Sequence, residues 1–233
     1  KLLKVNLNPQ LQSFMTDIDP FGYHVWKCNK NGYQTRTKYI HDILVDLWTR
    51  MLNHSGCDHV RKEPAYCFTS SNKRPDGSWN SGGGVTSYFD VRTCDPLLKD
   101  IVYKACDTPG IANIEGQMAK DSVWYNLIHS QNDKFIPICH EYPGAMGDPA
   151  YALLNASAAR FSSSIPQQSI FKSFWLSRFH LAVARGTADH ILERMPTYSD
   201  SPQNHPYSPT STLNIPAPTC TTQNCISHLP TFI

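Results

Sequence analysis

A histidine and a glutamate stand side by side in Cys139-His140-Glu141, just before the turn-type sequence Tyr142-Pro143-Gly144. Histidine titrates near neutral pH, and a neighbouring carboxylate can orient it or raise its pKa, as general acid–base catalysis requires. His140 and Glu141 are therefore the first candidate catalytic residues, and the turn residues place them on a loop. The alternative interpretation is a disulfide-bonded cysteine flanked by surface polar residues.

A second candidate set lies on a long helical segment near residue 190. His190 and Glu193 are three residues apart and share a helix face, with His180 ten residues earlier near the neighbouring face. A His-x-x-Glu pair could ligate a metal, but one helix rarely supplies a complete site. The H-E-x-x-H, phosphate-loop, dinucleotide and G-x-S-x-G motifs are absent, so we predict no metal and no cofactor. The alternative is a solvated helix face with ion pairs.

Three further residues are candidates for binding a ligand. Trp79 lies beside Gly82-Gly83-Gly84, in a stretch from Ser71 to Gly84 that is rich in Ser, Asn and Gly and is predicted to be an exposed loop. An exposed indole can stack on a sugar ring or a base, although Trp79 could instead cover a disulfide or a sheet. Lys73 and Arg74 could contact a phosphate, or could simply be solvated surface residues.

Three short stretches resemble two known families of secreted enzymes. Trp79-Asn80-Ser81-Gly82 and Leu153-Leu154-Asn155-Ala156-Ser157 resemble isolated parts of the ADP-ribosyl cyclase family. That resemblance implies a NAD-consuming enzyme with a helical half and several disulfides, but the acidic Thr-Leu-Glu-Asp motif of the family and its second essential glutamate are not found. Residues Tyr23 to Tyr33 resemble the strand–cysteine–tyrosine opening of small fungal ribonucleases, without their His-Glu-Arg set.

The cysteines and sequons indicate the compartment. The 233 residues include an even number of cysteines, eight, with no C-x-x-C spacing, which favours an oxidised framework over a zinc site. These are Cys28, Cys57, Cys67, Cys94, Cys106, Cys139, Cys220 and Cys225. Asn53-His54-Ser55 and Asn155-Ala156-Ser157 match the N-glycosylation sequon. We therefore expect a secreted, extracellular glycoprotein whose signal peptide has been removed from before Lys1.

Composition excludes several classes of protein. The chain is 40% hydrophobic and 17% charged, which permits a real core, and its formal net charge of +2 argues against a broad nucleic-acid footprint. No apolar run approaches the roughly 18–20 residues of a membrane span, so a soluble protein is expected. The partner is predicted to be a small molecule or a protein ligand of unknown identity.

Hydrophobic periodicity predicts mainly helices. The best pattern covers residues 38–52, ending at Asn53-His54-Ser55-Gly56. Further helices are predicted from Asp95-Pro96 to about Ala105, from Ile111 to His129, from Asp148-Pro149 onward, and from Ser164 to about Met195. The buried stripe of the last should be Ile170, Phe174, Leu181, Ala184, Ala188, Ile191 and Met195, and that of the Ile111 helix should include Ile114, Met118, Tyr125 and Ile128. Short strands are predicted at Tyr23 to Cys28, Ala65 to Thr69 and Val85 to Arg92.

The predicted architecture is an α+β fold, mainly α-helical, in one disulfide-stapled globular domain over residues 1–195 with a small β element. The proline-rich segment 196–233 should be an extended tail pinned by a disulfide. The favoured function is a secreted enzyme that uses His/Glu acid–base chemistry on a nucleotide, glycan or ester. Two alternatives stay open, a non-catalytic binding or effector protein that acts through surface loops, and a divergent NAD glycohydrolase of the ADP-ribosyl cyclase type.

Overall fold

The structure is a computed structural model, and it describes residues 40–65, 67–68, 71–98, 100–129, 132–142 and 144–192. A mixed five-stranded β-sheet lies at the centre of this part of the chain. Its strands, in both chain and spatial order, are β1 (Asp58–Lys62), β2 (Gly77–Asn80), β3 (Thr86–Cys94), β4 (Lys134–Glu141) and β5 (Ala145–Met146). Only β3 and β4 are parallel; their register pairs Ser87 with Lys134 and Cys94 with Glu141. A parallel pair needs a long crossover, and helices supply it here.

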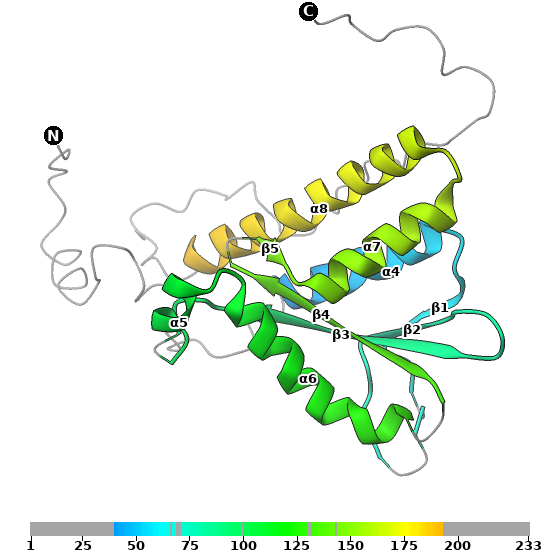
Figure 1. Cartoon of the computed structure of the whole chain (residues 1–233), viewed down its shortest axis with the longest axis horizontal. Coiled ribbons are helices and arrows are strands. Elements are labelled where there is room, and N and C mark those ends of the chain that lie inside the picture. Colours follow the sequence, from blue (N-terminus) through cyan, green and yellow to red (C-terminus); the bar gives the residue numbers. More distant parts are fainter. Residues whose placement is uncertain are drawn as a thin grey trace, which may run out of the picture. The chain divides into compact units, whose positions relative to one another are not determined.

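Helices cover both faces of this sheet (Figure 1). The crossover between β3 and β4 contains α5 (Val102–Asp107) and α6 (Ile111–His129), and α6 packs on one face. On the other face lie α4 (Asp42–His54), α7 (Asp148–Phe161) and α8 (Ile165–Leu192). The described part of the chain is therefore a three-layer α/β arrangement.

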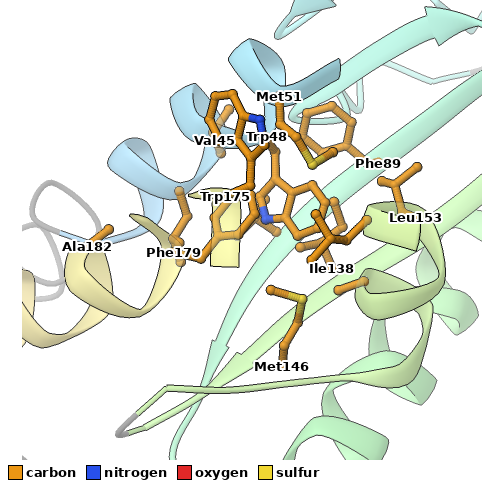
Figure 2. Packing of buried hydrophobic residues seen from close by; sticks show 14 of the residues in the cluster. Val45, Trp48, Met51, Phe89, Ile138, Met146, Leu153, Trp175, Phe179 and Ala182 are labelled. Atoms are coloured by element: carbon orange, nitrogen blue, oxygen red, sulfur yellow. The ribbon is translucent and has the colours of Figure 1, made fainter. Parts of the chain in front are cut away.

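Strand alternation divides the core into two sides. Phe89 and Ile138 point into the larger cluster with Trp48, Trp175 and Phe179 from the helices, as Figure 2 shows. On the opposite face Tyr88 packs with Phe68, Trp124 and Ile128, and Cys94 and Cys139 pack with Ala112. The central strands are thus buried on both faces, which places any polar residue on them next to a helix.

Several predicted elements are confirmed. The helix at 38–52 corresponds to α4, and it is followed by Gly56 at a φ of 77°, in the left-handed conformation. The predicted limits of α6 are those observed, α7 begins at Asp148, and the strand predicted at Val85 to Arg92 corresponds to β3. Mixed helices and strands are confirmed as the fold class, with a sheet larger than the small β element expected.

Other predictions are wrong. Residues 65, 67 and 68 are not in a strand, and the predicted loop from Ser71 to Gly84 contains β2. Several residues predicted to be buried are exposed instead: on α6 these are Ile114, Met118 and Tyr125, and on α8 they are Ile170, Leu181, Ala184 and Ala188. The buried stripe of α8 is formed by Phe171, Trp175, Phe179 and Val183. Both helices carry apolar residues around more than one face, so periodicity alone selects the wrong stripe.

The cysteines of the described region form no disulfide: Cys57, Cys67, Cys94, Cys106 and Cys139 are free thiols in this structure. Cys28, Cys220 and Cys225 lie outside the described residues, as does the predicted strand at Tyr23 to Cys28. The chain divides into two units, Lys1–Pro196 and Thr197–Ile233, and every described residue belongs to the first. The predicted tail therefore also lies outside the described residues.

Among the described residues, no helix combines the length and apolarity that crossing a membrane would require.

Candidate acid–base site

Two aspartates meet where β2 begins beside β3. Gly77 of β2 pairs with Phe89, so Asp76, one residue before β2, lies opposite Asp90. The Oδ2 atom of Asp76 accepts a hydrogen bond from the backbone N–H of Val91 at 2.7 Å, and the two carboxyl groups hydrogen-bond each other. A carboxyl–carboxyl hydrogen bond requires a proton, so the two groups share one when Asp90 is protonated, which its pKa of about 6 makes the state below about pH 6.

Gly77 is required for this approach of the strands. A Cβ atom at Gly77 would collide with the ring of Phe89. The absence of a side chain lets β2 start directly after Asp76 and keeps its carboxylate beside the backbone of β3.

His41 reaches the pair from the start of α4. Its Nε2 atom lies 3.1 Å from Oδ2 of Asp76, and its Nδ1 atom lies 3.1 Å from Oδ1 of Asp42. Because both partners are carboxylates, both ring nitrogens can donate, which is the protonation state of imidazolium. The cluster therefore gathers one imidazole and two carboxyl groups from three segments distant in the sequence.

The helix α6 supplies the donors on the other side of Asp90. Lys120 and Trp124 are four residues apart and therefore share a helix face. The Nζ atom of Lys120 lies 2.8 Å from Oδ1 of Asp90, and the indole N–H of Trp124 donates to Oδ2 at 2.6 Å. Asp90 thus joins the two helical layers through the central sheet.

The pKa values of the three groups are driven apart. Burial and the adjacent Asp76 raise the pKa of Asp90 to about 6, although the neighbouring charge of Lys120 lowers it. Burial acts against the carboxylate of Asp76 as well, but its hydrogen bonds with His41 and Asp90 hold its pKa below the usual value. Burial lowers the pKa of His41, and the carboxylates of Asp76 and Asp42 outweigh it and raise the value to about 9. At neutral pH His41 is therefore charged, and Asp76 is the more acidic of the two carboxyl groups.

The site remains in contact with solvent. The side chains of His41, Asp76, Asp90 and Lys120 are 26%, 16%, 11% and 23% exposed. Partial burial strengthens the electrostatic coupling of these groups while leaving them open to a small molecule.

The same three side chains also have the spacing of a cation site, since His41, Asp76 and Asp90 each offer one atom within 4.8 Å of the others. However, both oxygens of Asp90 already accept hydrogen bonds, and Lys120 places a positive charge against one of them. We therefore assign no metal ligands here and describe the cluster as one that holds and exchanges protons.

His140 and Glu141 are not brought together by the fold. They lie in β4, not on a loop, and consecutive strand residues point to opposite faces. The ring of His140 is buried against Trp48 on the α4 side, whereas Glu141 accepts the backbone N–H of Ala112 at 3.2 Å on the α6 side. The fold therefore does not bring the two side chains together as one acid–base pair.

The second predicted set is only partly described. His180 is exposed on α8, where its charge contributes to lowering the pKa of His140. His190 lies in α8, but its side chain and Glu193 are outside the described residues.

The candidate ligand-binding residues are dispersed. Trp79 is buried on β2, 5% exposed, and packs against the ring of Phe89. Lys73 and Arg74 are exposed, and Arg74 pairs with Glu63 at 3.2 Å. The sequon residues Asn53 and Asn155 are both exposed, on α4 and α7.

No protein-family model matches the chain, and no curated protein sequence matches it. Function is therefore inferred from the site itself.

Sequence reasoning missed His41, Asp76 and Asp90. One signal was available: Asp90 interrupts the otherwise apolar centre of the strand predicted at Val85 to Arg92. A carboxylate on a central strand must be paired when buried, so it indicates a partner elsewhere in the chain. The identity of the partners depends on tertiary contacts.

Proposed function

We propose that this protein is an acid–base enzyme that hydrolyses an ester, with His41, Asp76 and Asp90 as its catalytic centre. The observation that supports this proposal is the contact of Asp90 with Asp76, two carboxyl groups close enough to share a proton when Asp90 is protonated, next to the imidazole of His41. Pairs of titratable groups whose environments separate their pKa values are typical of acid–base centres.

The roles follow from the protonation states. Asp76, the more acidic carboxyl, serves as the base that takes a proton from a water molecule. Asp90 serves as the acid that protonates the carbonyl or the leaving alcohol. His41 is a positioning residue, because its charge holds Asp76 ionised.

The short separation of the carboxyl groups favours an ester over a glycan. Glycosidases keep their two carboxyl groups at least about 5 Å apart, to leave room for the sugar carbon and for water. Carboxyl groups in direct hydrogen bond, as here, instead suit a single water molecule that attacks a carbonyl, the arrangement of proton-sharing carboxyl dyads.

The test is hydrolysis of a panel of aryl and alkyl esters, with nucleotides and oligosaccharides in parallel. Wild-type protein should hydrolyse an ester, and Asp76→Asn and Asp90→Asn should each lose activity by about two to four orders of magnitude. His41→Gln should lower kcat and move the acid limb of the pH profile, which a purely structural role would not move. Asp107→Asn, at an exposed position, serves as the matched control.

Folding of the variants is checked by near-ultraviolet circular dichroism, since Trp124 contacts Asp90. Full activity in folded Asp76→Asn and Asp90→Asn would overturn the proposal, as would the absence of hydrolysis by the wild-type protein across the panel.

We further propose that the enzyme acts outside the cell as a secreted glycoprotein. The two exposed sequon residues, Asn53 and Asn155, support this setting. NAD⁺ belongs in the substrate panel, because the resemblance of Trp79–Gly82 and Leu153–Ser157 to ADP-ribosyl cyclases makes a NAD glycohydrolase the alternative enzyme.

A second candidate function is non-catalytic binding. One observation favours it: Ile114, Met118 and Tyr125 form an exposed apolar stripe on α6, with Met118 66% exposed. If this stripe binds a partner, or a second copy of the chain, Met118→Glu should weaken that association and leave ester hydrolysis unchanged. Sedimentation velocity over a range of concentrations distinguishes self-association from a monomer.

A further inference from the structure

A groove of about 850 Å³ lies between α7 and the edge of β4, and its lining includes none of His41, Asp76, Asp90 and Lys120. Much of its lining is apolar and comes from strands β2 and β4 and from helix α7: Trp79, Ile136, Pro149, Ala152, Leu153 and Ala156. Sites for small molecules have this size and this mostly apolar character.

The groove exists because β4 is only partly covered along one edge. The strand β5 pairs only with His140 and Glu141, so no described strand continues along residues 134–138 on that side. Pro137 lies in this uncovered half, as is usual for edge strands, because proline has no N–H to donate.

The facing surface of α7 is narrow. Pro149, Ala152, Ala156 and Arg160 recur at three- and four-residue intervals, so they share one helix face. Two alanines in the middle of this face leave space that larger side chains would fill.

One end of the groove is cationic. The chain turns back after β4, so α7 runs in the opposite direction along it and the last turn of α7 lies near the first residue of β4. Arg160 and Lys134 therefore lie at the same end, where Ser87 is paired with Lys134 in the sheet register. Neither cation has an ion pair with a carboxylate of the described residues.

The hydroxyl groups at this end are preorganised. Ser87 donates to Oγ of Ser81 at 3.1 Å, and Ser81 donates to the backbone oxygen of Val85 at 3.0 Å. Asp121 also lines the groove, but it lies eight residues before the end of α6 and so is set back from the cationic end. Two cations and one carboxylate leave one net positive charge, which complements a single negative charge.

We infer that this groove binds a long-chain carboxylate of the fatty-acid type. The apolar middle accommodates the chain, and Lys134 and Arg160 bind the carboxylate at the end. The inference does not depend on the proposed catalytic centre, because none of the catalytic residues lines the groove.

The test measures binding of dodecanoate by isothermal titration calorimetry, at concentrations where it forms no micelles. Dodecanol, which has the chain without the charge, and acetate, which has the charge without the chain, are measured in parallel. Dodecanoate should bind, dodecanol should bind about tenfold more weakly, and acetate should not bind, because the chain supplies most of the affinity and the charge a smaller part.

Two variants locate the ligand. Lys134→Gln combined with Arg160→Gln should weaken dodecanoate about tenfold and leave dodecanol unchanged. Ala156→Phe fills the middle of the groove from an exposed helix position and should abolish binding of both. Lys172→Gln combined with Arg185→Gln on α8 removes the same charge elsewhere and is the matched control.

The inference is overturned if wild-type protein does not bind dodecanoate, if Ala156→Phe binds it normally, or if the two charge variants behave alike. Asp76→Asn should bind dodecanoate like wild type, so failure here is distinguishable from failure of the catalytic proposal.

Discussion

Trp48 donates its indole N–H to Nε2 of His140 at 3.0 Å, in the core between α4 and β4. Because Nε2 accepts this bond, the proton of the neutral imidazole must lie on Nδ1, which has no hydrogen-bond partner among the described residues. Burial lowers the pKa of His140 to about 3, with a smaller contribution from His180. His140 is therefore a neutral core residue at ordinary pH.

This relationship predicts acid sensitivity. The unfolded chain protonates His140 near its ordinary pKa of about 6.5, whereas the folded protein does not until about pH 3, so the free energy of unfolding should fall as pH falls between these values. The loss should reach about 3 kcal/mol at about pH 4. Chemical denaturation at a series of pH values measures it.

His140→Gln keeps an acceptor for Trp48 and does not titrate, so its stability should fall less steeply over the same range. Trp48→Phe leaves His140 buried and should keep the slope of the wild type. Equal slopes for His140→Gln and wild type would contradict the burial argument.

Gly116 on α6 allows the helix to approach the two buried thiols. A Cβ atom at this position would lie 2.5 Å from Sγ of Cys94 and 3.1 Å from Sγ of Cys139. Gly116→Ala should therefore destabilise the protein by about 1–3 kcal/mol, since overpacking moves α6 or the strands. Thermal unfolding measures this effect.

The double variant Gly116→Ala with Cys94→Ala removes the closest sulfur and makes room for the new methyl group. It should recover part of the stability lost in Gly116→Ala, relative to Cys94→Ala alone. A purely additive loss would mean that the contact with Cys94 is not the cause.

Trp124 tunes the acidity of Asp90. Removing its indole N–H takes away a donor that favours the charged carboxylate, so Trp124→Phe should raise the pKa of Asp90 further above about 6. Carboxyl ¹³C NMR of Asp90 should show a midpoint near 6 in the wild type and a higher one in the variant. The alkaline limb of ester hydrolysis, which needs protonated Asp90, should move in the same direction. A lower or unchanged midpoint would refute the role given to this hydrogen bond.

The two sequons predict glycan attachment on different helices. Both asparagines are exposed, but Nδ2 of Asn53 donates to the backbone oxygen of Thr49 at 2.9 Å within α4, and a glycan on that nitrogen would perturb this bond. After expression through a eukaryotic secretory pathway, Asn155 should therefore be modified more completely than Asn53. Mass spectrometry of Asn53→Gln and Asn155→Gln gives the occupancy of the remaining site, and an unmodified protein would contradict the proposed extracellular setting.

Local patterns were sufficient for the helices with clear ends. The periodicity from Ile40 to Leu52 and the glycine at 56 predict α4 because amphipathic spacing and a left-handed terminal residue are encoded within a few residues. The sequence Lys134–Glu141 was not predicted as a strand, since a strand buried on both faces does not alternate and contains a proline here. The turn-type sequence Tyr142-Pro143-Gly144 that follows led His140 and Glu141 to be assigned to one loop.

By itself, the sequence determined the mixed helix and strand content, the presence of α4, the extent of α6, and the strand β3, all of which depend on near neighbours in the chain. Tertiary structure alone decided which faces of α6 and α8 are buried and which titratable groups meet. His41, Asp76, Asp90 and Lys120 come from four separate segments, and their protonation depends on burial and charge at distances set only by the packed sheet and helices. No local pattern carries that information, because each side chain acquires its partners only when the layers assemble.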